Sequence, residues 1–298
     1  MTKPVIVCFP GNEGIAHPLA SSIGGELAQV IWHEFPDGET NITIKTPLKA
    51  RQVIVLCSLD RPDDKLVKLL FCAATAKDLG AARVGLVAPY LAYMRQDRRF
   101  AAGQGVTAKY FPRAIEIGFD WLVTVDPHLH RIDALSQVYS IASEAVHAAP
   151  AIARWVAQNI KNPVLIGPDG ESAQWVQAMA HAANAPFVVL SKKRLGDARV
   201  EIDIPDMSQW KNHRPVLMDD IISTGRSMIR VVRGLKAAGL AAPWCIGVHA
   251  VFAGNACADL RQSGVAGIVT CNTIRHETNR IDISALLTGP VLRQLAGD

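Results

Sequence analysis

The sequence predicts an α/β protein made of two similar halves, each with a mainly parallel sheet flanked by helices. Short β-branched runs alternate with amphipathic stretches along the chain. Strands that alternate with helices in this way are typical of parallel sheets covered by helices. The two halves also repeat one another, because the order of strand, turn, helix, glycine and strand in 53–88 returns in 216–251. We therefore expect a duplicated domain, although any two α/β domains share some of this likeness.

Individual helices and strands are predicted from the apolar runs and from the residues that end them. Two of the expected helices end at Gly80 and Gly239, and glycine is a common helix terminator. A helix expected over Ala145–Gln158 and the turn Lys161–Pro163 lie near the boundary between the halves. The expected strands are Val53–Ser58, Val84–Ala88, Trp121–Val125, Val164–Ile166, Val216–Met218, Cys245–Val251 and Ile268–Cys271, and the expected helices are Asp64–Leu79, Ala173–Ala182 and Ser227–Ala238. The expected domains are 1–143 and 144–285, with a C-terminal helix in 286–298 that packs back on the first domain.

Composition narrows the class of protein. The 298 residues are enough for two domains, and 49% hydrophobic with 19% charged residues is a globular composition. The net charge of +4 suits phosphorylated small molecules, but it is too dispersed to indicate nucleic acid. No apolar run approaches the roughly 20 residues of a membrane span. The start has no signal-peptide pattern, and six scattered cysteines indicate free thiols in a reducing cytoplasm.

The segment 214–227, RPVLMDDIISTGRS, carries the clearest chemistry. A buried strand is followed by a loop and then by a helix with apolar residues at helical spacing. Such a loop presents backbone N–H groups and the positive end of a helix to an anion. Thr224, Gly225 and Ser227 offer hydroxyls and a close backbone approach, which suits a phosphate. Asp219 and Asp220 at the carboxyl end of the strand suit sugar hydroxyls or a metal, so the pair predicts a ribose phosphate site.

This loop resembles the phosphoribosyl-binding loop of the type I phosphoribosyltransferase fold. Other segments are similar, in order and spacing, to the ribose-phosphate pyrophosphokinase (PRPP synthetase) family, and several of these motifs are specific to that family. They are FPDGE at Phe35–Glu39, PYLAYMRQDRRF at Pro89–Phe100, VTVDPHLHRI at Val123–Ile132, GPDGES at Gly167–Ser172 and SKKR at Ser191–Arg194. The resemblance implies two tandem domains of this fold and covers the chain from about residue 5 to its C-terminus.

The resemblance also implies the reaction, in which the β,γ-diphosphoryl group of Mg-ATP passes to the anomeric hydroxyl of ribose 5-phosphate, giving PRPP and AMP. It also implies a homo-oligomer, because the FPDGE turn of this family enters a neighbouring subunit. The oligomer would be a dimer or a larger assembly such as a hexamer. The ATP-binding residues would be Phe35, Asp37, Glu39, Arg95, Gln96, Asp97 and His128, and the ribose 5-phosphate-binding residues would be Asp219, Asp220, Ser223, Thr224, Gly225, Arg226 and Ser227.

Metal-binding and catalytic residues follow from the same comparison. His128 and Asp169 are the candidate residues for Mg²⁺; since Mg²⁺ prefers oxygen and its own waters, His128 suits a phosphate or water partner and Asp169 an inner ligand. His130 matches a histidine of archaeal-type members. Lys192 and Arg194, on a loop after the strand Phe187–Leu190, would stabilise the transferred group.

Some positions depart from the family pattern. Arg226 replaces a small residue in the phosphate loop, and the PDGES turn lacks a second glycine. The loop after RQDR differs from that of strongly regulated members, so control by phosphate or ADP stays open. Two alternatives also stay open: a phosphoribosyltransferase that consumes PRPP, and a non-catalytic relative that assembles with an active synthetase.

Overall fold

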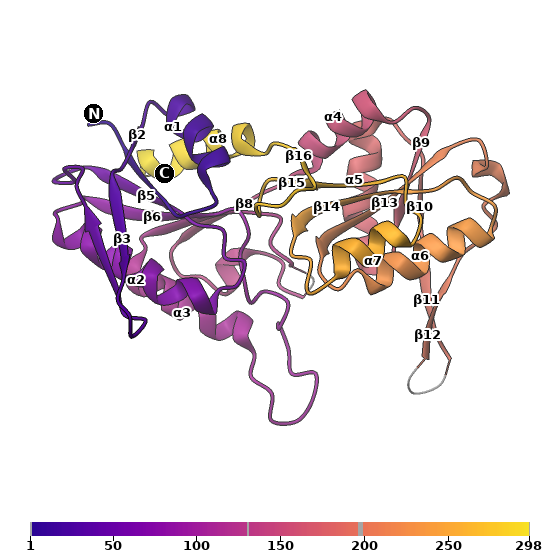
Figure 1. Cartoon of the computed structure of the whole chain (residues 1–298), viewed down its shortest axis with the longest axis horizontal. Helices are drawn as coiled ribbons and strands as arrows, with labels where there is room; N and C mark the ends of the chain where they lie inside the picture. Colours follow the sequence, from indigo (N-terminus) through magenta and orange to yellow (C-terminus); the bar gives the residue numbers. More distant parts are fainter. Residues whose placement is uncertain (1, 130, 196–198, 298) are drawn as a thin grey trace. The chain divides into compact units, whose positions relative to one another are not determined.

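A computed structural model describes residues 2–129, 131–195 and 199–297 of the chain. The chain divides into two compact units, one of residues 1–147 with 283–298 and one of residues 148–282. Each unit contains its own six-stranded parallel sheet (Figure 1). The limits of the functional domains, expected at residues 143/144 and 285/286, stay a prediction.

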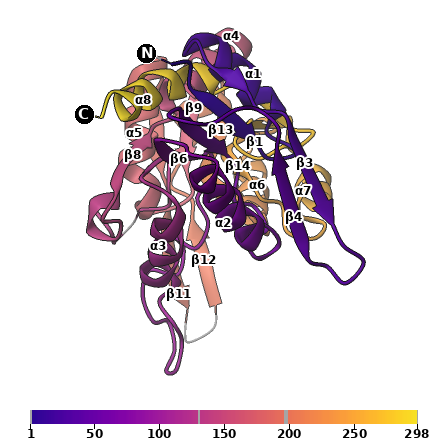
Figure 2. The same cartoon turned by 90° about the vertical axis from the view of Figure 1, so that its left-hand side faces the viewer.

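In the first unit, the sheet has the strand order β2-β1-β5-β6-β7-β8. Helices α2 and α3 cover one face and helices α1 and α8 cover the other (Figure 2). The strands of the sheet are β1 Val5–Cys8, β2 Glu26–Leu27, β5 Gln52–Leu56, β6 Arg83–Ala88, β7 Trp121–Val125 and β8 Ala142–Val146. The helices are α1 Glu13–Ser22, α2 Asp63–Asp78, α3 Thr107–Gly118, the short η1 Leu135–Gln137 and α8 Ser284–Ala296, while β3 Val30–Glu34 and β4 Thr40–Ile44 form a separate antiparallel hairpin.

The second unit repeats this plan with the strand order β10-β9-β13-β14-β15-β16. Its strands are β9 Pro163–Gly167, β10 Phe187–Val189, β13 Arg214–Ile222, β14 Trp244–Ala250, β15 Gly267–Cys271 and β16 Asn279–Ile281, with a hairpin of β11 Ser191–Leu195 and β12 Arg199–Asp203. Its helices are α4 Ala149–Asn159, η2 Gly170–Ser172, α5 Ala173–Ala183, η3 Ser208–Trp210, α6 Arg226–Ala237 and α7 Ala256–Gln262. The matching strand orders confirm the expected pair of similar α/β halves.

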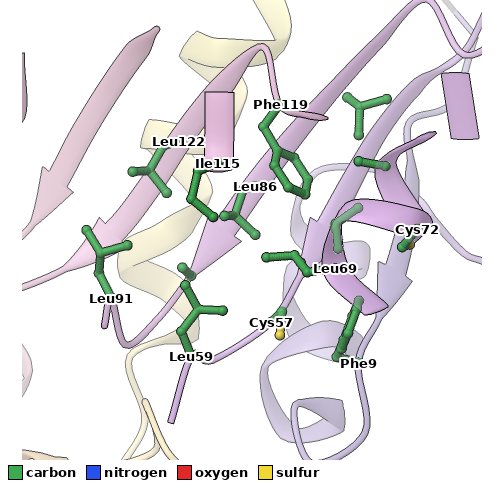
Figure 3. Close-up of a cluster of buried hydrophobic side chains, with 14 of the residues drawn as sticks. Phe9, Cys57, Leu59, Leu69, Cys72, Leu86, Leu91, Ile115, Phe119 and Leu122 are labelled. Carbon is green, nitrogen blue, oxygen red and sulfur yellow. The ribbon is translucent and has the colours of Figure 1, made fainter. Parts of the chain in front are cut away.

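Both sheets are held by buried aliphatic side chains, as expected for strands covered on two faces. In the first unit, Leu69 and Cys72 of α2 and Ile115 of α3 pack on Leu86 and Leu122 of the sheet (Figure 3). In the second unit, Met228, Val231, Val232 and Leu235 of α6 pack against a core that includes Leu217 and Cys245. The apolar spacing seen in the sequence of α6 is therefore its buried face.

Three local expectations were wrong. The helix expected from Ala145 begins at Ala149, because 142–146 form the edge strand β8, whose small and polar residues resemble no typical strand. The K-x-R loop is a strand, β11, paired with β12. The strand expected to end at Met218 continues to Ile222, so the two acidic residues lie within β13.

Candidate functional site

The acidic pair of the second unit lies in the last half of β13. Asp219 and Asp220 are half-buried between the apolar residues Met218 and Ile221. The Asp219 carboxylate accepts a hydrogen bond from the backbone N–H of Asp220 at 3.1 Å, and the Asp220 carboxylate accepts one from Ile221 N–H at 2.8 Å. Burial raises the pKa of Asp219 well above its ordinary value, and the neighbouring charges of Asp220 and Asp169 raise it further.

Asp169 reaches the same place from the end of β9. Its Oδ1 accepts a hydrogen bond from Ser172 N–H at 3.2 Å, while the Ser172 hydroxyl donates to the Asp169 carbonyl at 2.6 Å. Gly167 permits this tight turn, because a Cβ there would lie 2.5 Å from the Ser172 hydroxyl. Carboxylate oxygens are the ligands that Mg²⁺ prefers, so the donor chemistry of Asp169 with the Asp219–Asp220 pair fits that ion.

The loop expected to bind the phosphate lies directly between β13 and α6. Gly225 has φ +67° and precedes α6, a conformation that glycine adopts without strain. Thr224, Arg226 and Ser227 are exposed, and Ser223 is half-buried. The first N–H groups of α6 have no acceptor within the helix and point toward the loop, which makes this end of α6 suited to an anion. The loop is backed by 252–256, since Ala253 N–H donates to the Ser223 carbonyl at 3.1 Å.

Lys192 and Arg194 lie two positions apart on β11, in register with Ile202 and Val200 of β12. Their side chains lie outside the described part of the chain. The hairpin is inserted between β10 and β13, and the hairpin β3–β4 occupies the same place between β2 and β5 of the first unit. Both hairpins carry residues that the sequence singled out.

The first hairpin presents Phe35, Asp37 and Glu39 at its tip. Phe35 N–H donates to the Glu39 carbonyl at 2.8 Å, and the Asp37 carboxylate accepts from Glu39 N–H at 3.2 Å, so the turn is closed by its own residues. The Phe35 ring is 41% exposed and meets His33 edge-on at 4.5 Å. Lys68 Nζ of α2 donates to the carboxylate of Glu34 at 2.7 Å and ties the hairpin to the unit.

Some side chains of the RQDR loop stabilise its conformation by hydrogen bonds, and others are exposed. The Asp97 carboxylate is 2% exposed and accepts from Arg131 Nη1 at 3.2 and 3.1 Å. Gln96 donates to the Arg98 carbonyl at 3.3 Å and so also holds the loop. The Arg95 side chain is exposed and makes no ion pair among the described residues. Arg95 thus presents an exposed guanidinium at the start of the loop.

His128 follows β7 and is half-buried. Two residues earlier, buried Asp126 adopts a positive φ of 34° and its carboxylate meets His147 Nδ1 at 2.9 Å. That hydrogen bond raises the pKa of His147. His130 lies outside the described residues.

The sequence analysis did not single out three residues of the first unit, Asp126, Arg131 and His147. Arg131 directly follows the His-x-His motif, and its position there was the signal. Asp126 lies at the carboxyl end of a strand, where ligand-binding residues gather in α/β sheets. His147 had no signal in the sequence, because its pairing with Asp126 comes from the alignment of β8 beside β7.

Two family models match the chain. Residues 5–117 match the N-terminal domain of ribose phosphate pyrophosphokinase, and residues 135–284 match the phosphoribosyl transferase domain. A protein of Saccharolobus solfataricus named ribose-phosphate pyrophosphokinase is 31% identical over 91% of this chain and 93% of its own. A protein of the same name from Methanopyrus kandleri is 31% identical over 94% and 96%. The resemblance inferred from the motifs is confirmed.

The fold has a counterpart among solved structures. A phosphoribosylpyrophosphate synthetase from Mycobacterium smegmatis superposes with a TM-score of 0.86 at 19% identity and covers 100% of both chains. This likeness confirms the expected fold class. Within the described part of the chain, no helix combines the length and apolarity needed to cross a membrane.

Proposed function

Since the chain belongs to the ribose-phosphate pyrophosphokinase family, we propose that it is a diphosphokinase that makes PRPP. It transfers the β,γ-diphosphoryl group of ATP to the C1 hydroxyl of ribose 5-phosphate and releases AMP. The observation that carries this proposal is the loop of the second unit that joins the half-buried acidic pair of β13 to the start of α6.

The second unit binds the acceptor. The 5-phosphate accepts hydrogen bonds from the N–H groups that begin α6 and from the hydroxyls of Ser223, Thr224 and Ser227. Gly225 lets the phosphate approach the backbone, and Arg226 adds a charged contact at the start of the helix. The ribose hydroxyls donate to Asp219 and Asp220, because carboxylates accept hydrogen bonds from hydroxyls and repel a phosphate.

The first unit binds the nucleotide. Arg95 contacts the phosphates, because its exposed guanidinium makes no ion pair among the described residues. His128 contacts a phosphate oxygen or a metal-bound water. Gln96 and Asp97 hold the loop that presents Arg95, and Phe35, Asp37 and Glu39 bind adenine by stacking and by accepting from its amino group.

The family reaction uses Mg-ATP, and Mg²⁺ supplies neutralisation of the phosphate charge when it is bound. We propose that Asp169 is the protein ligand nearest this ion. Lys192 and Arg194 on β11 stabilise the charge of the transferred group. This assignment agrees with phosphoryl transfer, which depends on positioning and charge more than on covalent chemistry.

We also propose that the protein is a cytoplasmic homo-oligomer. The exposed apolar side chains Ile31 and Phe35 on the first hairpin support contact with a second copy. All six cysteines are free, which supports a reducing compartment.

One assay tests the activity and its alternatives. The protein is incubated with Mg-ATP and ribose 5-phosphate, and AMP and PRPP are measured together; equal amounts of both are expected. A phosphoribosyltransferase would form no AMP and would consume added PRPP with a base. A non-catalytic relative would form neither product, and absence of AMP above background would overturn the proposal.

A further inference from the structure

A cluster of metal-ligating side chains lies apart from the acidic pair, at the start of α7. Cys257, His276 and Glu277 each offer one ligand atom, and these atoms all lie within 4.8 Å of one another. Cys257 is the second residue of α7, while the other two lie between β15 and β16. All three belong to the second unit, and none belongs to the motifs that identify the family.

We propose that Cys257, His276 and Glu277 form a binding site for a transition-metal ion of the Zn²⁺ class. A thiolate, an imidazole and a carboxylate are the ligands that Zn²⁺ takes, whereas Mg²⁺ takes oxygen alone. With bonds of about 2.0–2.3 Å, a tetrahedral site separates its ligand atoms by roughly 3.3–3.8 Å. The ligand atoms therefore need to approach one another by at most roughly 1.5 Å around the ion, and water takes the fourth position.

The surroundings hold the histidine in place for this role. His276 Nδ1 meets the hydroxyl of Thr278 at 2.8 Å, and that buried hydroxyl meets Thr270 Oγ1 at 2.8 Å. The ring also packs against Phe252, with centroids 4.5 Å apart. The backbone N–H of Thr278 also donates to Nδ1 at 3.2 Å, so Nδ1 is engaged and Nε2 is the ring nitrogen that can turn to the ion. Coordination by Nε2 requires the tautomer with its proton on Nδ1, which then donates to the Thr278 hydroxyl.

One existing interaction competes with the metal. Arg261 Nη2 pairs with Glu277 Oε1 at 2.8 Å, and Cys257 Sγ lies 3.9 Å from the same oxygen. Both partners of the ion pair are more than half exposed, at 53% and 62%, and such pairs contribute little free energy. Glu277 can therefore exchange Arg261 for the ion at small cost.

The site adjoins the phosphate loop. Ala256, next to Cys257, has its carbonyl 3.6 Å from where a Cβ of Gly225 would stand, and Phe252 N–H donates to the Ile222 carbonyl at 2.8 Å. Metal binding moves Cys257 and thereby the segment that backs the loop. We expect it to weaken binding of ribose 5-phosphate, an effect that rests on the proposed function of the loop.

Metal binding is tested on the full chain without substrate, in excess Mg²⁺ to occupy carboxylate sites. Co²⁺ should give a thiolate charge-transfer band, and Zn²⁺ should abolish it at one ion per chain. Cys257→Ser should lose the band and His276→Gln should weaken Co²⁺ binding at least tenfold, while Cys8→Ser, a half-buried cysteine of the first unit, should keep both. Thermal melting confirms that each variant is folded. A band that persists in Cys257→Ser, or none in the unchanged protein, overturns the site.

The effect on the loop has its own measurement. Zn²⁺ should raise the KM for ribose 5-phosphate several-fold in the unchanged protein and leave it constant in Cys257→Ser. An equal effect in both proteins would overturn the coupling, because the ion would then act elsewhere. If the protein has no synthetase activity, the Co²⁺ band still decides whether the metal site exists.

Discussion

At the scale of single residues, the backbone conformation of Gly225 affects both the stability of the fold and the proposed binding of the 5-phosphate. Its φ of +67° is costly for other residues, and it lies within the loop that we assign to the 5-phosphate, where a Cβ would stand 3.6 Å from the Ala256 carbonyl. We expect Gly225→Ala to raise the KM for ribose 5-phosphate at least tenfold and to lower stability by about 1–2 kcal/mol.

Gly239 provides the matched control for this change. It has φ +79°, it lies beyond the other end of α6, and nothing lies within 4 Å of its Cβ position. Gly239→Ala should cost similar stability in denaturant unfolding without changing the KM. An unchanged KM in both variants would argue against the loop as the phosphate site.

Asp97 and Arg131 show how a motif residue can act by holding a loop. The Asp97 carboxylate is buried and paired, so removal of Arg131 leaves a charge without its partner. We expect Arg131→Ala to raise the KM for ATP about tenfold and to leave that for ribose 5-phosphate unchanged, in steady-state kinetics. Arg98→Ala is the control, because the Arg98 guanidinium lies over the ring of Phe100 and makes no ion pair with another described residue. Equal effects of the two changes would contradict the holding role.

The His147–Asp126 pair predicts a pH dependence of stability. The hydrogen bond to Asp126 raises the pKa of His147 above its usual 6.5. A raised pKa stabilises the fold fully below 6.5, and this stabilisation is lost as the pH rises through the folded-state pKa. Because the ring is 74% exposed, we expect a loss of only about 1–3 °C in Tm between pH 6 and pH 8.5. This change of Tm with pH should vanish in His147→Gln. An identical dependence of Tm on pH in the two proteins would refute the role of the His147–Asp126 pair.

At the scale of elements, the β11–β12 hairpin places the charged SKKR segment on a paired strand. The sequence of SKKR indicated a loop, because its charged residues lack the β-branched pattern of a strand; the pairing with β12 supplies the order instead. We expect Lys192→Ala to lower kcat by about 10²–10³ with a small change in KM, as for loss of a group that acts in the transition state. Lys193→Ala on the same strand should retain kcat within about twofold.

Strong periodicity was enough to predict most elements, and tertiary pairing decided the rest. The buried face of α6 and the strands β6 and β7 were visible as apolar runs, since burial on both faces of a sheet leaves a simple pattern. Strand β8 was not, because it lies at the sheet edge and is half-exposed. For the site, motif residues could be named from the sequence. The contacts of Arg131 with Asp97 and of His147 with Asp126 could not be predicted, because they join segments that meet only in the fold.

At the scale of the whole molecule, the duplication gives each half the same sheet and a hairpin at the same place. The first hairpin carries Phe35 and the second carries Lys192 and Arg194. We infer that the two halves share a scaffold and differ in chemistry, since the acidic pair and the loop that we assign to a phosphate both follow from β13 of the second half. Phe35 is exposed at a hairpin tip, while Arg95 lies on a loop after β6. In the family to which the chain belongs, the FPDGE turn enters a neighbouring subunit, so we expect these two residues to serve one nucleotide from different copies of the chain.

Mixing two variants with weakened ATP binding tests this division between subunits. Phe35→Ala and Arg95→Ala should each raise the KM for ATP at least tenfold, whereas Ile117→Ala, an exposed apolar residue of α3 with no assigned role, should not. In mixed oligomers, a site that combines Arg95 of one copy with Phe35 of another has both residues intact. If equal amounts of the two variants exchange subunits at random, about a quarter of all sites are of this kind, and activity at low ATP should recover to about that fraction. No recovery, with subunit exchange verified by mass spectrometry of tagged chains, would place Phe35 and Arg95 of one nucleotide site on the same chain.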